Sequence, residues 1–351
     1  MKLYDLGYVS WQDSQALYHT LPRIGREGLF ILAPSSPYVS IGRHQDARYD
    51  VDLDYCRQHH TPVMRREVGG GAVYLDGNQI FYQLIIHRDN PLAPPRKDEF
   101  YERFLQAPIA AYRELGIDAR YKPVNDIITA EGRKISGNGV AEIGDFIVFV
   151  GNLIVDFDYE TMVRVLKVPD EKFRDKIYKT LKENLSTIKR ELGYAPPFDE
   201  LRKLLAAKFE GILGSLERVN EVDPELRAKT DEVSRWLFSE EWLLAGGRKK
   251  APADRVKIRE GVEVQHKVYK APGGLIRAVY RLEEGRIYDV SLSGDFFFYP
   301  SEALEELEMA LEGVALEDVE ATIERFFASR GVEAPGITPG DFRMILAGEA
   351  A

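Results

Sequence analysis

Three consecutive glycines, Gly69, Gly70 and Gly71, follow the basic pair Arg65-Arg66 after two intervening residues. A backbone without Cβ atoms lets main-chain N–H groups close around an anion, and guanidinium groups can hold its charge. The residues before the glycines have the pattern of a short strand, so the loop is expected at a strand end. A bulge or tight packing point is the alternative, but three glycines are more than a bulge needs. The segment predicts an anion-binding loop.

Two polar segments further along the chain complete the pattern. They are Asn125-Asp126 and the run Gly132-Arg133-Lys134-Ile135-Ser136-Gly137. Neither is specific by itself, because Asn-Asp pairs are common in turns and most lysines are merely solvated. In this order and separation, however, the basic glycine loop and the two later segments resemble the lipoate-protein ligase family of the biotin/lipoate protein ligase superfamily.

The resemblance covers nearly the whole chain. The segment Ser40-Ile41-Gly42-Arg43-His44-Gln45 is similar to the family's early strand with its Gly-Arg-x-Gln pattern, and the C-terminal part resembles an accessory domain that some lipoate ligases carry. The implied fold is α+β, with a mixed β-sheet flanked by helices and a small α+β C-terminal domain. The implied activity is ATP-dependent attachment of lipoate to a lysine of a carrier protein.

The resemblance also implies roles for particular residues. Lys134 would be the catalytic cation that contacts both the acyl carbonyl and the phosphate of the acyl-adenylate. Asp126 is the candidate Mg²⁺ ligand, because hard cations favour carboxylate and phosphate oxygens. Adjacent strand residues point to opposite faces, so Arg65 and Arg66 are expected to have different roles. The resemblance favours Arg66, which is nearer the loop, for contact with the ligand and leaves Arg65 as the structural one. The expected substrate- and ATP-binding residues are Arg66, Gly69, Gly70, Gly71, Val73, Asn125, Asp126, Ser136 and Gly137.

Two departures from the family pattern affect the expected ligand contacts. Leu75-Asp76 stands where members commonly have His-Asp, and Phe149-Val150-Gly151-Asn152 stands where many have His-His-Gly-Thr. A different activity within the superfamily therefore stays open, namely an octanoyl- or lipoyl-transferase, some of which use a cysteine nucleophile. Cys56 lies in a predicted helix upstream of the loop. A non-catalytic protein that binds an acyl group or a carrier is a further alternative.

The chain is long enough for two domains. The glycine-rich, basic and apolar-poor segment 246–252 is the best linker candidate, which places a catalytic domain at 1–245 and an accessory domain at 253–351. Apolar periodicity predicts the elements within them. They are helices at 10–23, 52–60, 97–115 (disturbed by Pro108) and across 159–244, strands at 29–32, 38–42, 62–66, 72–74, 79–87, 126–129, 134–136 and 146–155, and strands then helices from 262 onward.

Composition limits the partners. A net charge of −10 opposes nucleic acid and anionic lipid, and no apolar stretch reaches the roughly 20 residues of a membrane span. The start lacks a signal-peptide pattern, so a cytoplasmic location is expected. A monomer is expected as well. One cysteine and six scattered histidines predict no metal cluster.

The ligands that the resemblance implies are ATP, Mg²⁺ and lipoate or octanoate. The implied partner is a lipoyl carrier, which would be a dehydrogenase E2 subunit, the glycine-cleavage H protein or a lipoate-binding protein of sulfur metabolism.

Charge is unevenly distributed. Residues 164–190 carry nine Lys/Arg and four Asp/Glu, a net charge of +5, whereas residues 301–325 carry nine acidic residues and one arginine, a net charge of −8. Such runs usually mark solvated helix faces. A docking pair is the other interpretation.

Overall fold

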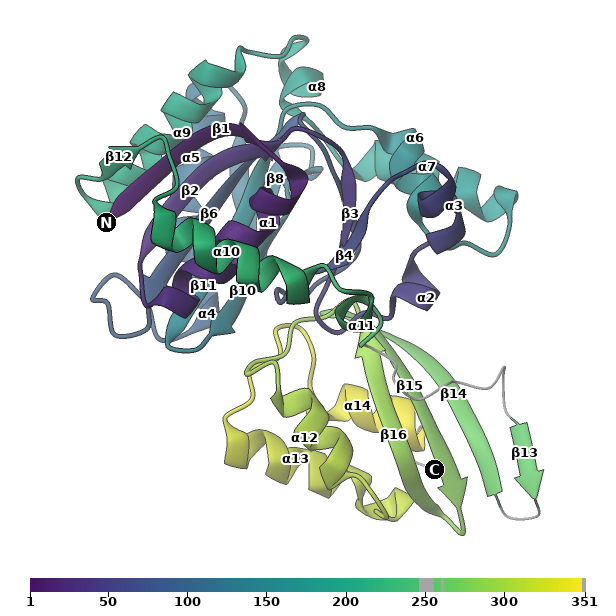
Figure 1. Ribbon diagram of the computed structural model, residues 1–351. Helices are drawn as coiled ribbons and strands as arrows, with labels where there is room; N and C mark the ends of the chain where they lie inside the picture. Colours follow the sequence, from purple (N-terminus) through teal and green to yellow (C-terminus); the bar gives the residue numbers. More distant parts are fainter. Residues whose placement is uncertain (246–255, 260–261, 349–351) are drawn as a thin grey trace. The chain divides into compact units, whose positions relative to one another are not determined.

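The computed structural model describes residues 1–245, 256–259 and 262–348, and it divides into two compact units (Figure 1). Unit 1 consists of residues 1–40, 51–64 and 73–239. Unit 2 consists of residues 41–50 and 65–72 together with the described residues from Glu240 onward.

The contacts thus assign the glycine loop to the unit that contains the C-terminal residues, which the sequence pattern did not indicate. The domain limits 1–245 and 253–351 stay a prediction. The predicted linker, 246–252, lies outside the described residues.

Unit 1 is built on a mixed six-stranded sheet with the strand order β10-β11-β6-β2-β1-β12. Strand β1 runs parallel to β2 and β12, whereas the pairs from β2 to β10 are antiparallel. This sheet confirms the expected α+β class. Its strands are β1 (Lys2–Val9), β2 (Gly28–Pro34), β6 (Gln79–His87), β10 (Asn138–Ile143), β11 (Phe146–Ile154) and β12 (Glu217–Val219).

Helices cover both faces of this sheet (Figure 1). On β6, the Gln83 side-chain amide donates to the Ser14 carbonyl of α1 (2.7 Å), whereas the neighbouring Tyr82 ring packs against Phe209 of α9. Successive strand residues point to opposite faces, so α1 and α9 lie on opposite sides. Helix α10 packs on α1, and α5 packs on α9. The bounds are α1 (Trp11–Thr20), α5 (Gln106–Glu114), α9 (Phe198–Leu213) and α10 (Pro224–Leu237).

Two three-stranded sheets complete the strands of this part of the chain, in the orders β4-β3-β5 and β7-β8-β9. In the second, Ile127 of β8 pairs with Ser136 of β9, and Ile128 pairs with Lys134. The antiparallel hairpin therefore brings the two predicted polar segments together. The strands are β3 (Tyr38–Ile41), β4 (Val63–Arg65), β5 (Val73–Leu75), β7 (Ala119–Lys122), β8 (Asp126–Thr129) and β9 (Lys134–Ser136).

The single helix predicted at 97–115 is wrong, because two helices meet at Leu105. Pro108 does not cause the break: it lies in the first turn of the second helix, where a missing N–H leaves no hydrogen bond unmade. Ser10 caps α1, since its hydroxyl accepts from the Asp13 N–H at 3.0 Å. The other helices are η1 (Leu21–Ile24), α2 (Ala47–Asp50), α3 (Leu53–Gln58), α4 (Lys97–Phe104), α6 (Tyr159–Val165), α7 (Glu171–Asn184), α8 (Ile188–Leu192) and α11 (Glu240–Leu243).

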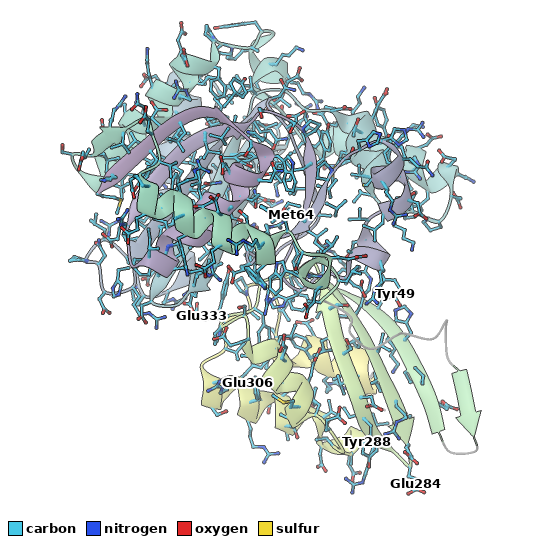
Figure 2. The ribbon with its side chains drawn as sticks, viewed as in Figure 1. Tyr49, Met64, Glu284, Tyr288, Glu306 and Glu333 are labelled. Carbon is cyan, nitrogen blue, oxygen red and sulfur yellow. The ribbon has the colours of Figure 1, made fainter. Side chains whose placement is uncertain are left out.

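Unit 2 contains an antiparallel sheet in the order β13-β14-β15-β16. Helices pack on it around a core that includes Phe296, Phe298 and Phe342. Glu306, labelled in Figure 2, forms an ion pair with Arg330 between two of these helices. The elements are β13 (Val256–Arg259), β14 (Val262–Ala271), β15 (Gly274–Glu283), β16 (Arg286–Gly294), α12 (Ala303–Ala310), η2 (Leu316–Asp318), α13 (Val319–Arg330) and α14 (Pro339–Ala347). Among the described residues, no helix is long and apolar enough to cross a membrane.

Candidate active site

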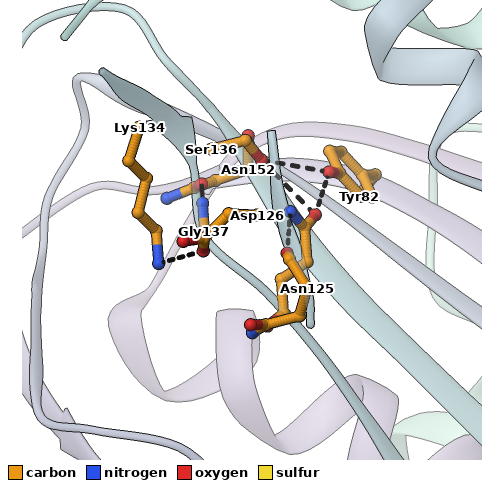
Figure 3. A network of polar contacts seen from close by, with 8 residues as sticks. Tyr82, Asn125, Asp126, Lys134, Ser136, Gly137 and Asn152 are labelled. Carbon is orange, nitrogen blue, oxygen red and sulfur yellow. Dashed lines mark hydrogen bonds and ion pairs between the residues drawn. The ribbon is translucent and has the colours of Figure 1, made fainter. Parts of the chain in front are cut away.

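Asp126, at the start of β8, and Lys134, at the start of β9, form an ion pair across the β8–β9 hairpin in unit 1 (Figure 3). Nζ of Lys134 lies 2.6 Å from Oδ1 of Asp126, and the two side chains are 39% and 30% exposed. The ammonium group is therefore held by a carboxylate and still accessible to a ligand. The structure thus brings together the predicted catalytic cation and the predicted metal ligand.

Beneath this pair lies a buried network of polar groups (Figure 3). The Ser136 hydroxyl donates to the Asn152 carbonyl (2.6 Å) and lies 3.2 Å from the Tyr82 hydroxyl. The Gly137 N–H donates to Oδ1 of Asn152 at 2.9 Å, and Nδ2 of Asn152 donates to Gln79 at 2.8 Å. These bonds fix β9 against β11 and β6. Ser136 is fully buried, and its hydroxyl group forms its hydrogen bonds within the protein.

Asn125 is tied to the start of β10. Its Nδ2 donates to the carbonyl of Asn138, and Nδ2 of Asn138 donates back to the Asn125 carbonyl at 2.9 Å. These reciprocal bonds hold the turn that presents Asp126. The side-chain amide of Asn125 thus positions the backbone in this structure.

Sequence reasoning missed Asn138, Tyr82 and Gln79 as parts of the site, and it noted Asn152 only as a departure from the family pattern. A signal was present for Tyr82 and Asn152, because these polar residues lie within strands that are otherwise largely apolar, whereas Gln79 and Asn138 each begin a strand. Burying an unpaired amide is costly, so such residues indicate a fixed hydrogen-bond network.

The glycine loop lies in unit 2, where its polar groups are partly occupied. The Gly70 N–H donates to the carbonyl of Phe296 (3.2 Å). Nη2 of Arg66 donates to the carbonyls of Gly69 (2.8 Å) and Gly71 (2.9 Å). A guanidinium group that closes its own loop in this way holds positive charge where an anion would bind. Val73, the remaining predicted ligand residue, begins β5 in unit 1.

The segment with the Gly-Arg-x-Gln pattern packs directly against the glycine loop through Gly42. A Cβ atom on Gly42 would lie 1.9 Å from the Gly70 carbonyl oxygen, so any side chain there would displace the loop. Oε1 of Gln45 accepts from the Gly42 N–H at 2.9 Å. The glycine of this pattern is needed because the backbone at Gly42 lies very close to the backbone at Gly70. The glutamine of the pattern, Gln45, accepts the hydrogen bond that holds Gly42 in place.

Arg65 lies in the interior of unit 2, as expected for the structural member of the arginine pair. Its side chain is fully buried, and burial lowers its pKa to about 10. The guanidinium group donates to main-chain carbonyls at 2.6–3.2 Å. These acceptors belong to Gly42, Arg43, Gln45, Trp242 and Leu243. The arginine thus joins three segments of unit 2.

The described residues contain no group of three or more His, Cys, Asp or Glu side chains that could enclose a metal. Asp126 supplies a carboxylate beside the Lys134 ammonium. This donor set suits Mg²⁺, which typically takes one or two carboxylates and completes its shell with substrate phosphates and water. The site therefore fits a metal that arrives with a nucleotide better than a resident metal.

Known proteins are similar to this chain over much of its length. The family model of the lipoyl protein ligase A/B catalytic domain matches residues 7–210. The chain belongs to this family. Over 80% of its length it is 25% identical to lipoate–protein ligase 2 of Staphylococcus aureus, of which the match covers 78%. It is also 24% identical, over 59% of its length, to an octanoyltransferase of Geobacillus kaustophilus, of which 82% is covered.

Solved structures of lipoate ligases share the fold. The bipartite lipoate protein ligase of Thermoplasma acidophilum, described together with its E2 lipoyl domain, matches with a TM-score of 0.58 at 26% identity over 72% of this chain and 100% of its own. A lipoate-protein ligase A bound with ATP matches with a TM-score of 0.55 at 25% identity, covering 69% of this chain and 98% of its own. The expected lipoate ligase architecture with a C-terminal domain is confirmed.

Proposed function

We propose that this protein is an ATP-dependent lipoate–protein ligase. In the first step the carboxylate of lipoate attacks the α-phosphate of ATP, and pyrophosphate leaves. In the second step the ε-amine of a carrier lysine attacks the acyl carbonyl, so that an amide forms, AMP leaves and a proton is released. The observation that carries the proposal is the accessible Lys134 ammonium, held at 2.6 Å by Asp126 above a fixed polar network.

The proposed role of Lys134 follows from the charge of the first step. The carboxylate and the α-phosphate repel each other until a cation lies between them, and a cation fixed in advance requires no reorganisation during the reaction. Asp126 fixes the ammonium group in the resting protein. When the nucleotide binds, the same carboxylate would hold Mg²⁺, which would neutralise phosphate charge. Arg66 and the N–H groups of Gly69 and Gly71 would contribute further donors to the substrates, whereas the Gly70 N–H already donates to the Phe296 carbonyl.

The second step needs a protein substrate that presents a lysine. The Thermoplasma ligase is paired with an E2 lipoyl domain of its own organism, and a carrier of this kind is the proposed partner here. The glycine-cleavage H protein and a lipoate-binding protein of sulfur metabolism are the other candidates. Octanoate differs from lipoate in its tail and not in its carboxylate, so either acid would meet Lys134 in the same way.

An acyl-transferase is the second candidate, because octanoyltransferases are among the relatives. In such an enzyme a cysteine would take the acyl group from a thioester. Cys56 fits this role poorly: it is buried in α3, and burial raises the pKa of its thiol to about 11. At neutral pH almost none of it would be the reactive thiolate.

An ATP/pyrophosphate exchange assay separates these functions. The ligase should exchange pyrophosphate in the presence of lipoate or octanoate but not of biotin. A transferase or a non-catalytic homologue should give no exchange with any of the three. Absence of lipoate- and octanoate-dependent exchange, in a protein that transfers octanoyl groups from a carrier thioester, would overturn the ligase assignment.

A further inference from the structure

Helix α7 is unusually exposed for a helix of its length. None of its residues is buried, and it packs mainly on α6. Phe173, near its start, is 46% exposed. A single exposed aromatic ring is common on protein surfaces, so the case for a binding surface rests on the charge of this helix.

Three lysines follow one face of this helix at i, i+4 and i+7. Lys172, Lys176 and Lys179 are all exposed, and none of them takes part in an ion pair within the described residues. The helix as a whole carries five basic and three acidic residues. Because one helix face holds residues at this spacing, the lysines form a stripe of uncompensated positive charge.

The lysine stripe continues into a pocket of about 430 Å³. Lys182 on the last turn of α7 lines this pocket, as do Lys189 and Arg190 of α8. Lys189 is neutralised by Asp156 at 2.6 Å, whereas Arg190 donates to main-chain carbonyls, which leaves its positive charge uncompensated. The basic surface therefore extends from α7 to α8.

This surface is joined to the candidate active site through the backbone. Leu185 pairs with Lys134 in a parallel bridge, and the Ser186 N–H donates to the Lys134 carbonyl at 2.7 Å. The segment that carries the pocket is thus the direct neighbour of the strand that carries the catalytic lysine. A protein held on α7 and α8 would lie next to the place where its lysine must react.

The charge of the surface selects its partner. The protein carries a net charge of −10, so its overall field repels other acidic proteins, and an acidic partner is attracted only where positive charge is concentrated. We propose that the lysine stripe of α7 and the adjoining basic pocket form the docking surface for an acidic face of the acyl-accepting carrier protein. This inference rests on the proposed function, because it assumes that a carrier is modified.

The test compares two reactions of the full-length protein. In the variant Lys172→Glu/Lys176→Glu/Lys179→Glu, lipoate-dependent ATP/pyrophosphate exchange should stay within about twofold of wild type, because within the described part of the chain these side chains form no hydrogen bond or ion pair with Lys134, Asp126 or the polar network beneath them. Transfer of lipoate to an apo lipoyl carrier should show KM raised on the order of tenfold or more at low salt, since charge steering changes association rates by about that factor. The probes are an apo E2 lipoyl domain, apo H protein and an apo lipoate-binding protein of sulfur metabolism.

Two controls separate docking from a general charge effect. Lys203→Glu, on an exposed position of α9 at the opposite side of unit 1 in Figure 1, makes the same charge change as Lys176→Glu and should leave KM for the carrier unchanged. The triple Lys→Arg variant keeps the charge and should restore the wild-type KM. Raised salt should remove most of the difference between the wild type and the triple Glu variant.

Each outcome is decisive. An unchanged KM in the triple Glu variant overturns the docking surface, and a lowered KM would favour the protein's own acidic segment 301–325 as its occupant. Equal effects of Lys176→Glu and Lys203→Glu would also overturn it. If the wild-type protein gives no exchange and modifies none of the three carriers, the proposed function fails first.

Discussion

The Lys134–Asp126 ion pair concentrates the chemistry of the candidate site in two side chains. The resemblance of the sequence to the lipoate-protein ligase family singled out both residues, and the hairpin brings them to 2.6 Å. The network beneath them was less predictable, because hydrogen bonds between Ser136, Asn152 and Gln79 join strands that are far apart in sequence. A local pattern marks which residues are polar in a strand, but not which partner each will meet.

Replacing Lys134 by Ala should reduce the rate of lipoate-dependent exchange by about 10² to 10³, because one preorganised charge is lost from the transition state. The fold should persist, since the side chain is 39% exposed and packs little. Exchange rates and the thermal midpoint provide the measurement. Lys208→Ala, which breaks an exposed ion pair with Glu114, is the matched control and should retain full exchange. Full exchange by the Lys134 variant would contradict the assignment.

His44 should make the stability of the protein depend on pH. Burial, together with nearby Arg43 and Arg65, lowers its pKa from 6.5 to about 3. Between these values the unfolded chain binds a proton that the folded protein does not. The free energy of unfolding therefore falls as pH drops from about 6.5 towards 3, by up to about 1.4 kcal/mol per pH unit.

Urea midpoints at pH 7.5 and pH 5 measure this effect. His44→Gln removes the titrating group, so the variant should lose less stability than the wild type between the two pH values. The comparison is within each protein, which cancels the loss of the stacking contact between the His44 ring and Phe296. Identical pH dependence in both proteins would show that His44 is already neutral in the unfolded state or accessible in the folded one.

At the scale of elements, apolar periodicity predicted most strands and helices of both units, including the strands that carry Lys134 and Asp126. It missed β1, β7, β10, β12 and β13. Asp5 and Gly7 interrupt the apolar pattern of β1, and the other four are short or continue directly from a neighbouring hairpin. It also joined α4 and α5, because apolar residues continue across the break at Leu105. Periodicity reports the buried face of an element but not where the backbone changes direction.

Two substitutions can show whether the glycines of the loop are needed for packing or for substrate binding. A Cβ atom on Gly69 would lie 2.8 Å from the Phe296 carbonyl oxygen, whereas one on Gly71 would meet only Asp295 at an ordinary 3.6 Å. Gly69→Ala should therefore lower the thermal midpoint, and Gly71→Ala should leave it nearly unchanged. If the loop binds the substrates, Gly71→Ala should still weaken lipoate or ATP binding in calorimetry, because the Cβ would narrow the approach to the loop N–H groups. Unchanged affinity of the Gly71→Ala variant for lipoate and ATP would show that the glycines are needed only for packing.

Two features involve the whole molecule, namely the uneven distribution of charge and the packing of segments that are far apart in sequence. The segments 164–190 and 301–325 carry opposite charges, and their attraction stays a prediction. What sequence could not indicate is that residues 41–50 and 65–72 pack with the C-terminal residues. A local sequence pattern cannot predict this packing, because it depends on which distant segment has a shape that fits the glycine loop.

Cleavage of the chain between residues 246 and 250 should therefore impair the overall reaction. The fragment 1–245 would keep Lys134 but lose Phe296 and Phe297, which contact Gly69 and Gly70. We expect the two fragments to associate, and more weakly at high salt, because exposed charges are screened beyond about 8 Å at physiological ionic strength. Sedimentation and lipoyl transfer are the measurements. Full activity of the first fragment without association would contradict this expectation.

The packing of the glycine loop on Phe296 and Phe297 also sets an order of events during synthesis. The loop leaves the ribosome early, and its packing partners are among the later residues of the chain. At about 5–20 residues per second, the delay is on the order of ten seconds or more. During that interval the strands that carry Lys134 and Asp126 can already form. The nascent protein would thus acquire its reactive lysine before its loop is supported, and it would mature only when the last domain has been translated.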